Sequence, residues 1–204
     1  MRLITRLTTA AMVALGSPAA ALTLTETFET LAPKDTPLPS LVSPVGTFTG
    51  QAGTPFANVF IASPGYTNFG PGNNPTTSSV LTANGDESFD VTLAFAARRI
   101  SMDLFLNDLG PATLTLFNGS AFVASFTFNA DASAANNNPS VFYEGSSVVV
   151  TRFTFVSTNG GSLNTGIDNV SITAVPEPAT WAAMLAGFAV AGLALRRQGR
   201  RALA

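Results

Sequence analysis

The sequence predicts an all-β fold, an antiparallel β-sandwich, between an N-terminal signal peptide and a single C-terminal transmembrane helix. Three observations support this expectation. Apolar and polar residues alternate with a period of two through much of the second half of the chain. Each end carries an uncharged apolar run beside arginines, and no long amphipathic helical pattern appears between the ends. We therefore divide the chain into residues 1–21, 22–175 and 176–201.

The composition restricts the chemistry that the chain can perform. Its 204 residues contain no cysteine and no histidine, which excludes a disulfide, a histidine-based catalytic triad and a Cys/His zinc site. Residues 22–175 carry four basic side chains against eleven acidic ones, a net charge of −7. This acidic body lacks the basic footprint of a nucleic-acid-binding protein, so we expect no nucleic-acid partner.

The first 21 residues have the three parts of a secretory signal peptide. Arg2 and Arg6 form a basic start, and residues 7–15 form an apolar core that is too short to span a bilayer comfortably. Ala19 and Ala21 place small residues at the positions that a signal peptidase requires. The sequence therefore predicts export of the chain and cleavage after Ala21.

The C-terminal end predicts a transmembrane helix over residues 179–195. This run has no charged residue, and as a helix it would be about 25 Å long, short but sufficient to span. Trp181 lies near its start, where an indole favours the membrane interface. Four arginines follow the run: Arg196, Arg197, Arg200 and Arg201. Basic residues next to a span stay on the cytoplasmic side, so we expect the body to lie outside.

The order of features in the tail also resembles a known sorting signal. Pro176, Glu177 and Pro178 precede Trp181, the apolar run and the arginines, in the sequence PEPATWAAMLAGFAVAGLALRR. This order resembles the PEP-CTERM sorting signal of Gram-negative bacteria, in its PEPxxWA variant. The resemblance covers about residues 175–201 and implies recognition by an exosortase, a membrane cysteine protease-transpeptidase that cuts near the Pro-Glu-Pro tripeptide. Substrates of such systems accompany exopolysaccharide and the biofilm matrix.

Alternation of apolar and polar residues predicts the strands of the body. Asn118-Gly119 separates two such runs and predicts a β-hairpin, because both residues tolerate positive φ. We assign the phenylalanines to the core, with Phe122, Phe126 and Phe128 on one face of the return strand. We expect strands at residues 22–28, 89–95, 100–106, 112–117, 121–128, 147–155 and 167–173, whereas residues 32–85 show no regular pattern.

One pair of acidic residues suggests a structural calcium ion. Glu29 follows the first predicted strand, and Asp168 lies in the last. If these strands pair, the carboxylates would meet, and calcium prefers oxygen ligands. This start-and-finish pattern resembles that of jelly-roll carbohydrate-binding modules, in which the metal is structural. The alternative is a turn or cap role for Asp168 and a solvent-facing Glu29; no other cofactor is expected.

Loop residues offer a second candidate site, for a sugar. Tyr66, Asn68, Phe69 and Tyr143 combine aromatic rings that stack on sugar rings with an amide that bonds hydroxyls. The body contains no tryptophan, which weakens this interpretation, and the alternative is ordinary loop packing.

Enzymatic activity finds little support in the sequence. Glycoside hydrolysis needs two carboxylates about 5 Å or about 6.5–9.5 Å apart. The available acids resemble ordinary surface charges: Asp86, Glu87, Asp90, Asp103 and Asp108. We therefore expect a non-enzymatic protein of the cell surface or extracellular matrix, with exosortase, the inner membrane and exopolysaccharide as partners. A polysaccharide-binding module with a structural calcium is the alternative, and a glycoside hydrolase is the least supported one.

Overall fold

The computed structural model describes the residues 21–51, 57–65, 78–84, 87–106, 111–129, 139–157, 165–174, 184–192 and 196. The chain divides into two compact units, Leu22–Val175 on the one hand and Met1–Ala21 with Pro176–Ala204 on the other. In the second unit, residues 184–192 are helical. Among the described residues, no helix has the length and hydropathy needed to cross a membrane.

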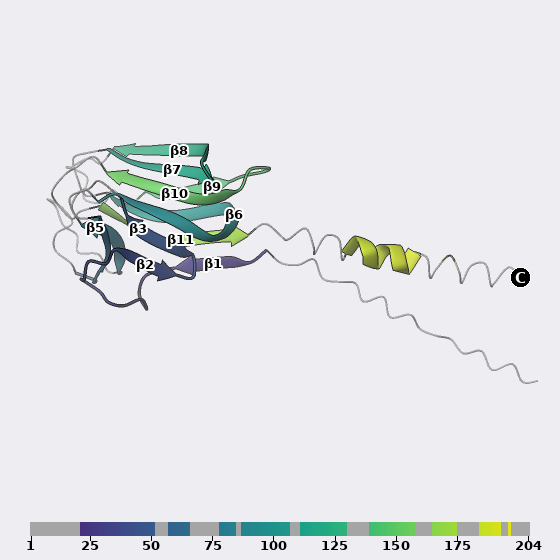
Figure 1. The fold of residues 1–204 in the computed structure, drawn as a ribbon, viewed down its shortest axis with the longest axis horizontal. Coiled ribbons are helices and arrows are strands. Elements are labelled where there is room, and N and C mark those ends of the chain that lie inside the picture. Colours follow the sequence, from purple (N-terminus) through teal and green to yellow (C-terminus); the bar gives the residue numbers. More distant parts are fainter. Residues whose placement is uncertain are drawn as a thin grey trace, which may run out of the picture. The chain divides into compact units, whose positions relative to one another are not determined.

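The unit Leu22–Val175 is built from antiparallel strands (Figure 1). The strands are β1 (Thr23–Glu26), β2 (Ser40–Ser43), β3 (Gly46–Gly50), β4 (Asn58–Ala62), β5 (Val80–Asn84), β6 (Phe89–Leu106), β7 (Pro111–Asn118), β8 (Ala121–Asn129), β9 (Ser140–Glu144), β10 (Val150–Ser157) and β11 (Thr165–Ala174). Their hydrogen-bonded order is β4-β5-β11-β6-β10-β7-β8, with β1 on β11, β2 on β3, and both β3 and β9 on β6. The predicted antiparallel all-β architecture is confirmed.

Strand β6 connects the two halves of this arrangement. Its first residues, Phe89–Leu93, lie between β3 and β10, whereas Arg99–Asp103 lie between β9 and β11. The sequence predicted two separate strands here, and the structure joins them into one of 18 residues. The sheet thus divides at β6 into two layers whose apolar faces enclose one core.

A change of register in β6 explains why the sequence read as two strands. Phe89, Val91 and Leu93 point into the core, and further along Ile100 and Met102 do so. The inward-pointing residues have odd numbers up to Leu93 and even numbers from Ile100 onward. The pairing of β6 with β10 and with β11 is irregular in the same region. A bulge bends a strand and moves its side chains to the opposite face, which fits a strand that serves two layers.

The core is rich in phenylalanine, as the sequence predicted. Phe28 and Phe48 pack edge to face with their ring centroids 5.5 Å apart. Phe89 and Phe155 are directly opposed on β6 and β10 and stack at 5.1 Å. Both packing modes suit the ring quadrupole and add to the burial of apolar area.

One detail of the predicted facing is wrong, and bulges disturb the alternation in two strands. The β7–β8 hairpin forms around Asn118-Gly119 as predicted. However, its register shifts between Leu116 and Phe117, and the Phe122 side chain is 65% exposed rather than in the core. In β10 a shift after Val150 places that residue in the core together with Phe153, although they lie three positions apart.

Strands β2 to β5 were not predicted. They lie within residues 32–85, which have prolines and no alternation. Strand β4 shows the reason, because four successive residues from Val59 to Ala62 are buried. Val59 and Ile61 face the main core, whereas Phe60 and Ala62 pack with Val80 in a second, smaller cluster. A strand that is apolar on both faces has no period-two signature.

Truncation of the stacked ring on β10 tests the shared core. The Phe155 side chain is fully buried, so Phe155→Ala should lower the free energy of unfolding by about 3–5 kcal/mol. Urea unfolding followed by circular dichroism would measure this. The matched control is Phe142→Ala, because the Phe142 side chain is 59% exposed and its removal should change the midpoint little. Equal shifts for both variants would contradict the assignment of the core.

Candidate functional site

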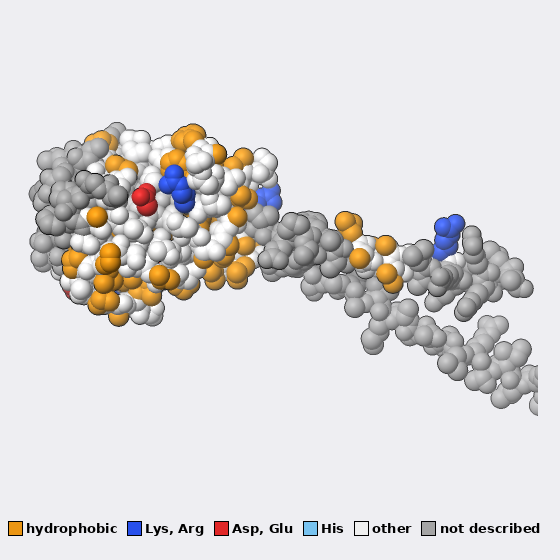
Figure 2. Space-filling model, viewed as in Figure 1, with side chains coloured by type: hydrophobic (Ala, Val, Ile, Leu, Met, Phe, Trp, Pro, Cys, Tyr) orange, Lys and Arg blue, Asp and Glu red, His pale blue; other side chains and the backbone are white. Residues whose placement is uncertain are grey.

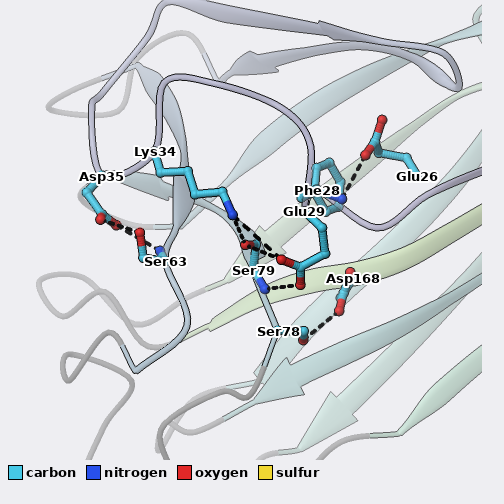
Figure 3. Close-up of polar contacts among 9 residues, drawn as sticks. All are labelled: Glu26, Phe28, Glu29, Lys34, Asp35, Ser63, Ser78, Ser79 and Asp168. Atoms are coloured by element: carbon cyan, nitrogen blue, oxygen red, sulfur yellow. Dashed lines mark hydrogen bonds and ion pairs between the residues drawn. The ribbon is translucent and has the colours of Figure 1, made fainter.

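The first and last strands pair and bring the two predicted carboxylates to adjacent serines (Figure 3). Strand β1 lies antiparallel to β11, with Glu26 opposite Val170. Just beyond β1, Glu29 accepts a hydrogen bond from the backbone N–H of Ser79 at 2.7 Å. Asp168 accepts one from the hydroxyl of the neighbouring Ser78 at 2.8 Å.

Asp168 is a buried carboxylate with two hydrogen-bond donors and two acidic neighbours. Only 1% of the residue is exposed, and its other oxygen accepts the backbone N–H of Asn169 at 2.7 Å. Asp168, on β11, lies directly opposite Asp103 on β6, and Glu29 adds a second negative charge nearby. Desolvation raises the pKa of Asp168, and repulsion from Glu29 and Asp103 raises it further, although the donated hydrogen bonds oppose the shift.

The acidic pair on β6 and β11 is held by polar side chains. Asp103 accepts hydrogen bonds from the Ser140 hydroxyl at 2.5 Å and from the Asn169 amide at 2.8 Å. Asn169 has a φ of 51°, and the register of β11 shifts just after Asp168. Asn adopts this left-handed conformation more readily than most residues, and here it aims its amide at Asp103.

Glu29 has the opposite electrostatic environment. Its second oxygen accepts the Ser79 hydroxyl at 3.0 Å and lies 3.6 Å from the Lys34 ammonium. Lys34 in turn donates to the Ser79 hydroxyl at 2.6 Å. The pKa of Glu29 is lowered, chiefly by the backbone hydrogen bond from Ser79, against a desolvation cost, with help from Ser79's hydroxyl and from Lys34.

Further carboxylates, which the sequence did not single out, fix the same stretch of chain. Glu26 accepts the backbone N–H of Phe28 at 2.7 Å, and Phe28 has a φ of 58°. Asp35 accepts both the backbone N–H and the hydroxyl of Ser63, at 2.8 and 2.5 Å. Asp35 and Glu29 tie the segment after β1 to the β4 and β5 region, whereas Glu26 fixes the chain locally at Phe28. No sequence motif predicts the contacts of Asp35 and Glu29, because they join residues far apart in the chain.

The calcium hypothesis remains a prediction. The structure does bring Glu29 and Asp168 to neighbouring serines, as the expected strand pairing required. Yet within the described ranges, no three or more His, Asp or Glu side chains group so that they could hold a metal ion. The oxygens of both carboxylates accept hydrogen bonds from protein groups, and Lys34 lies where a cation would otherwise be attracted.

Most of the predicted sugar-binding residues lie outside the described residues. This holds for Tyr66, Asn68 and Phe69. Tyr143 is described on β9, where its side chain is half-buried and packs against the main core. Its position is that of a packing residue whose side chain is partly exposed to solvent.

The hydrolase candidates are placed only in part. Asp86 and Asp108 lie outside the described residues, and Glu87 is fully buried. Asp90 faces outward on β6, and Asp103 is held by Ser140 and Asn169.

The sorting residues belong to the C-terminal unit. Pro176, Glu177, Pro178, Trp181 and Arg197 lie outside the described residues, and Arg196 is described and exposed. Residues 174–201 match the family model of the PEP-CTERM protein-sorting motif. The chain ends in a PEP-CTERM sorting motif. This motif implies an exported protein that an exosortase processes, as the sequence predicted.

Comparison with solved structures adds distant likenesses to the body that precedes the PEP-CTERM motif. An adhesin domain of Lys-gingipain is 16% identical, with a TM-score of 0.41 over 75% of this chain and 98% of that chain. Two variants of a family 29 carbohydrate-binding module are 10% and 9% identical to this chain, with TM-scores of 0.39 and 0.36. Both matches cover 75% of this chain, and they cover 92% and 85% of the respective module. No curated protein matches the chain.

Opposite pKa shifts predict opposite pH trends for two variants. Asp168 has a raised pKa, so its contribution to stability is present below its unfolded pKa of about 3.9 and is lost as pH rises through the folded value. Relative to the wild type, Asp168→Asn should therefore become more stable as the pH rises from 4 to 7.

Glu29 has a lowered pKa, and its contribution to stability is lost as the pH falls through the folded value. Glu29→Gln should therefore lose more stability at pH 7 than at pH 4.

Urea unfolding of both variants across this pH range measures these differences. Each substitution is isosteric and removes one ionisable group, so each variant controls for the other. Parallel pH trends in the two variants would contradict the electrostatic assignment.

Proposed function

We propose that the chain is a non-enzymatic component of the cell surface or extracellular matrix of a Gram-negative bacterium, with a structural role in exopolysaccharide or biofilm. The PEP-CTERM motif at residues 174–201 carries this proposal, because it marks the chain as a substrate of an exosortase. Residues 1–21 act as the signal peptide that starts export.

The mechanism that we propose is topological. The apolar run 179–195 spans the inner membrane, and the arginines after it stay in the cytoplasm. The Pro-Glu-Pro tripeptide then lies on the outer side, within reach of the exosortase. Pro176 and Pro178 also prevent a helix from continuing upstream into the body, so the tripeptide remains an extended substrate. The precursor is anchored in the inner membrane, and processing passes the body to the surface or matrix.

The body has features of a scaffold. Its first and last strands pair along β1 and β11, so both chain ends leave the unit from neighbouring strands. Its carboxylates Glu26, Glu29 and Asp35 are engaged in holding the segment after β1. These contacts stabilise a domain that has no cysteine and therefore no disulfide to stabilise it outside the cell.

The alternative of a calcium-stabilised polysaccharide-binding module makes a separate prediction. A structural ion at Glu29 and Asp168 would stabilise the folded state, so a chelator should lower the melting temperature and added calcium should restore it. Calorimetry of the full chain with and without chelator measures this. An unchanged melting temperature would remove the calcium alternative and leave the sorting proposal intact.

Substitution of the tripeptide tests processing. In the native host, Glu177→Gln combined with Pro176→Ala and Pro178→Ala should abolish cleavage, so the unprocessed chain should accumulate in the membrane fraction. Immunoblots of membrane and extracellular fractions measure this. Glu144→Gln is a matched control, because Glu144 pairs with Arg99 on the body surface, far from the motif in sequence. Normal processing of the triple variant would contradict the proposal.

The arginine cluster provides an independent test of topology. Replacement of Arg196, Arg197, Arg200 and Arg201 by glutamine removes the positive charge that holds the tail inside, so retention of the precursor at the membrane should fall. The four lysine substitutions keep the charge and should preserve retention. If the glutamine variant is retained as well as the lysine variant, charge is not what holds the tail.

A further inference from the structure

Three side chains form a continuous row across strands β10, β7 and β8, which are neighbours in the sheet (Figure 1). Arg152 is opposite Phe117, and Phe117 is opposite Phe122. Directly opposed residues in antiparallel strands share a face, so the three side chains lie on the same, outward side. The Arg152 guanidinium lies 3.9 Å from the centre of the Phe117 ring.

The row is fixed in place before any ligand binds. The Nε of Arg152 donates to the backbone carbonyl of Gly119 in the hairpin turn at 2.8 Å. This hydrogen bond and the cation–π contact hold the guanidinium over the Phe117 ring. A guanidinium and a ring held in this way lose little side-chain entropy on binding, which favours affinity.

Phe122 extends this platform to the edge of the sheet. Strand β8 ends the hydrogen-bonded order, and the register shift in the hairpin turns Phe122 outward. Phe122, Phe117 and Arg152 therefore form an aromatic strip rather than an isolated surface phenylalanine. Exposed apolar surface that gathers in one place on a soluble domain is typical of binding surfaces. In the other direction, the row continues to Thr92 on β6 and Thr47 on β3, about 19 Å over five strands.

Hydroxyl groups flank the strip. Thr115 and Ser125 are opposed on β7 and β8 with their hydroxyl oxygens 3.2 Å apart, and Thr113 and Thr127 form a similar pair at 3.3 Å. Thr154 continues the first of these rows on β10. The face therefore offers a line of hydroxyl groups that runs parallel to the aromatic strip.

Charge is nearly absent from this face. Arg152 is the only charged residue in the sequences of β7, β8 and β10, and Asp90 on β6 lies opposite Thr154. Figure 2 shows one side of the body, on which few of the described side chains are charged. The body as a whole carries a net charge of −7, which disfavours a polyanionic ligand.

We propose that this face binds a neutral polysaccharide, with a sugar ring over Phe122, Arg152 on the Phe117 ring as the fixed donor, and Thr115 and Ser125 bonding hydroxyls. We call these five residues the glycan face. A sugar ring has an apolar C–H side that covers an aromatic ring and a rim of hydroxyls that match threonine and serine. A protein partner fits less well, because cores of protein interfaces are depleted in serine and need a larger apolar centre than two rings.

This inference rests on the proposed role in exopolysaccharide and places the contact on a sheet face rather than on the loop residues considered from the sequence. The structure also supplies an internal control. On β9, Phe142 is exposed to a similar degree and lies 5.5 Å from the guanidinium of Arg99. That Arg99 is paired with Glu144, so the second Arg–Phe pair carries an acid that the glycan face lacks.

Affinity electrophoresis tests the glycan face. The full chain, in a polyoxyethylene detergent, is run through native gels that contain either the neutral or the acidic fraction of the host's exopolysaccharide, separated by anion exchange. The neutral fraction should retard the wild type. Phe122→Ala should weaken binding about tenfold, because it removes an apolar ring from the contact. Phe142→Ala should bind as the wild type does, and Arg152→Lys should bind more weakly because the flat donor is lost.

Four outcomes would overturn the inference. These are no retardation by the neutral fraction, retardation by the acidic fraction alone, equal loss in Phe122→Ala and Phe142→Ala, or self-association of the wild type that Phe122→Ala abolishes. Equal melting temperatures of the variants ensure that a loss of binding is not a loss of fold. A chain that is processed normally but not retarded refutes the glycan face alone, and a chain that is retarded but not processed refutes the sorting proposal alone.

Discussion

The structure depends on one long strand that belongs to two layers. Strand β6 pairs with β3 and β10 through its first residues and with β9 and β11 through its last. A bulge in its middle changes which side chains point inward, so that both halves bury apolar residues in the same core. The irregularity is therefore a requirement of the fold. Without it, one half of the strand would present its polar side chains to the core.

The second constraint is the closure of the body by its first and last strands. The β1–β11 pairing places Glu29 and Asp168 at adjacent serines, and the two carboxylates meet opposite environments there. Glu29 is neutralised by Lys34, whereas Asp168 is buried opposite Asp103 and is costly to ionise. Glu29 thus helps to hold the segment that leads out of β1, whereas Asp168 fixes Ser78 and the backbone of Asn169.

Sequence patterns predicted what depends on local alternation and missed what depends on partners. The hairpin at Asn118-Gly119 and the phenylalanine core followed from turn chemistry and period two. Strand β4 was missed because it is buried on both faces. The outward turn of Phe122 was missed because a bulge is a property of two paired strands, not of one. Of the candidate sites, the meeting of Glu29 and Asp168 was foreseeable from strand closure, whereas the row of Arg152, Phe117 and Phe122 required the register.

The central claim is that the tail decides where this protein goes and that the β body then works outside the cell. The intact mass of the mature protein from its native host, with and without the exosortase, tests this most directly. We predict a chain that begins at Leu22 and ends near Pro176–Pro178 only when the exosortase is present. A mature chain that retains residues 179–201 in the presence of the enzyme would contradict the claim and would make the protein a permanently anchored membrane protein.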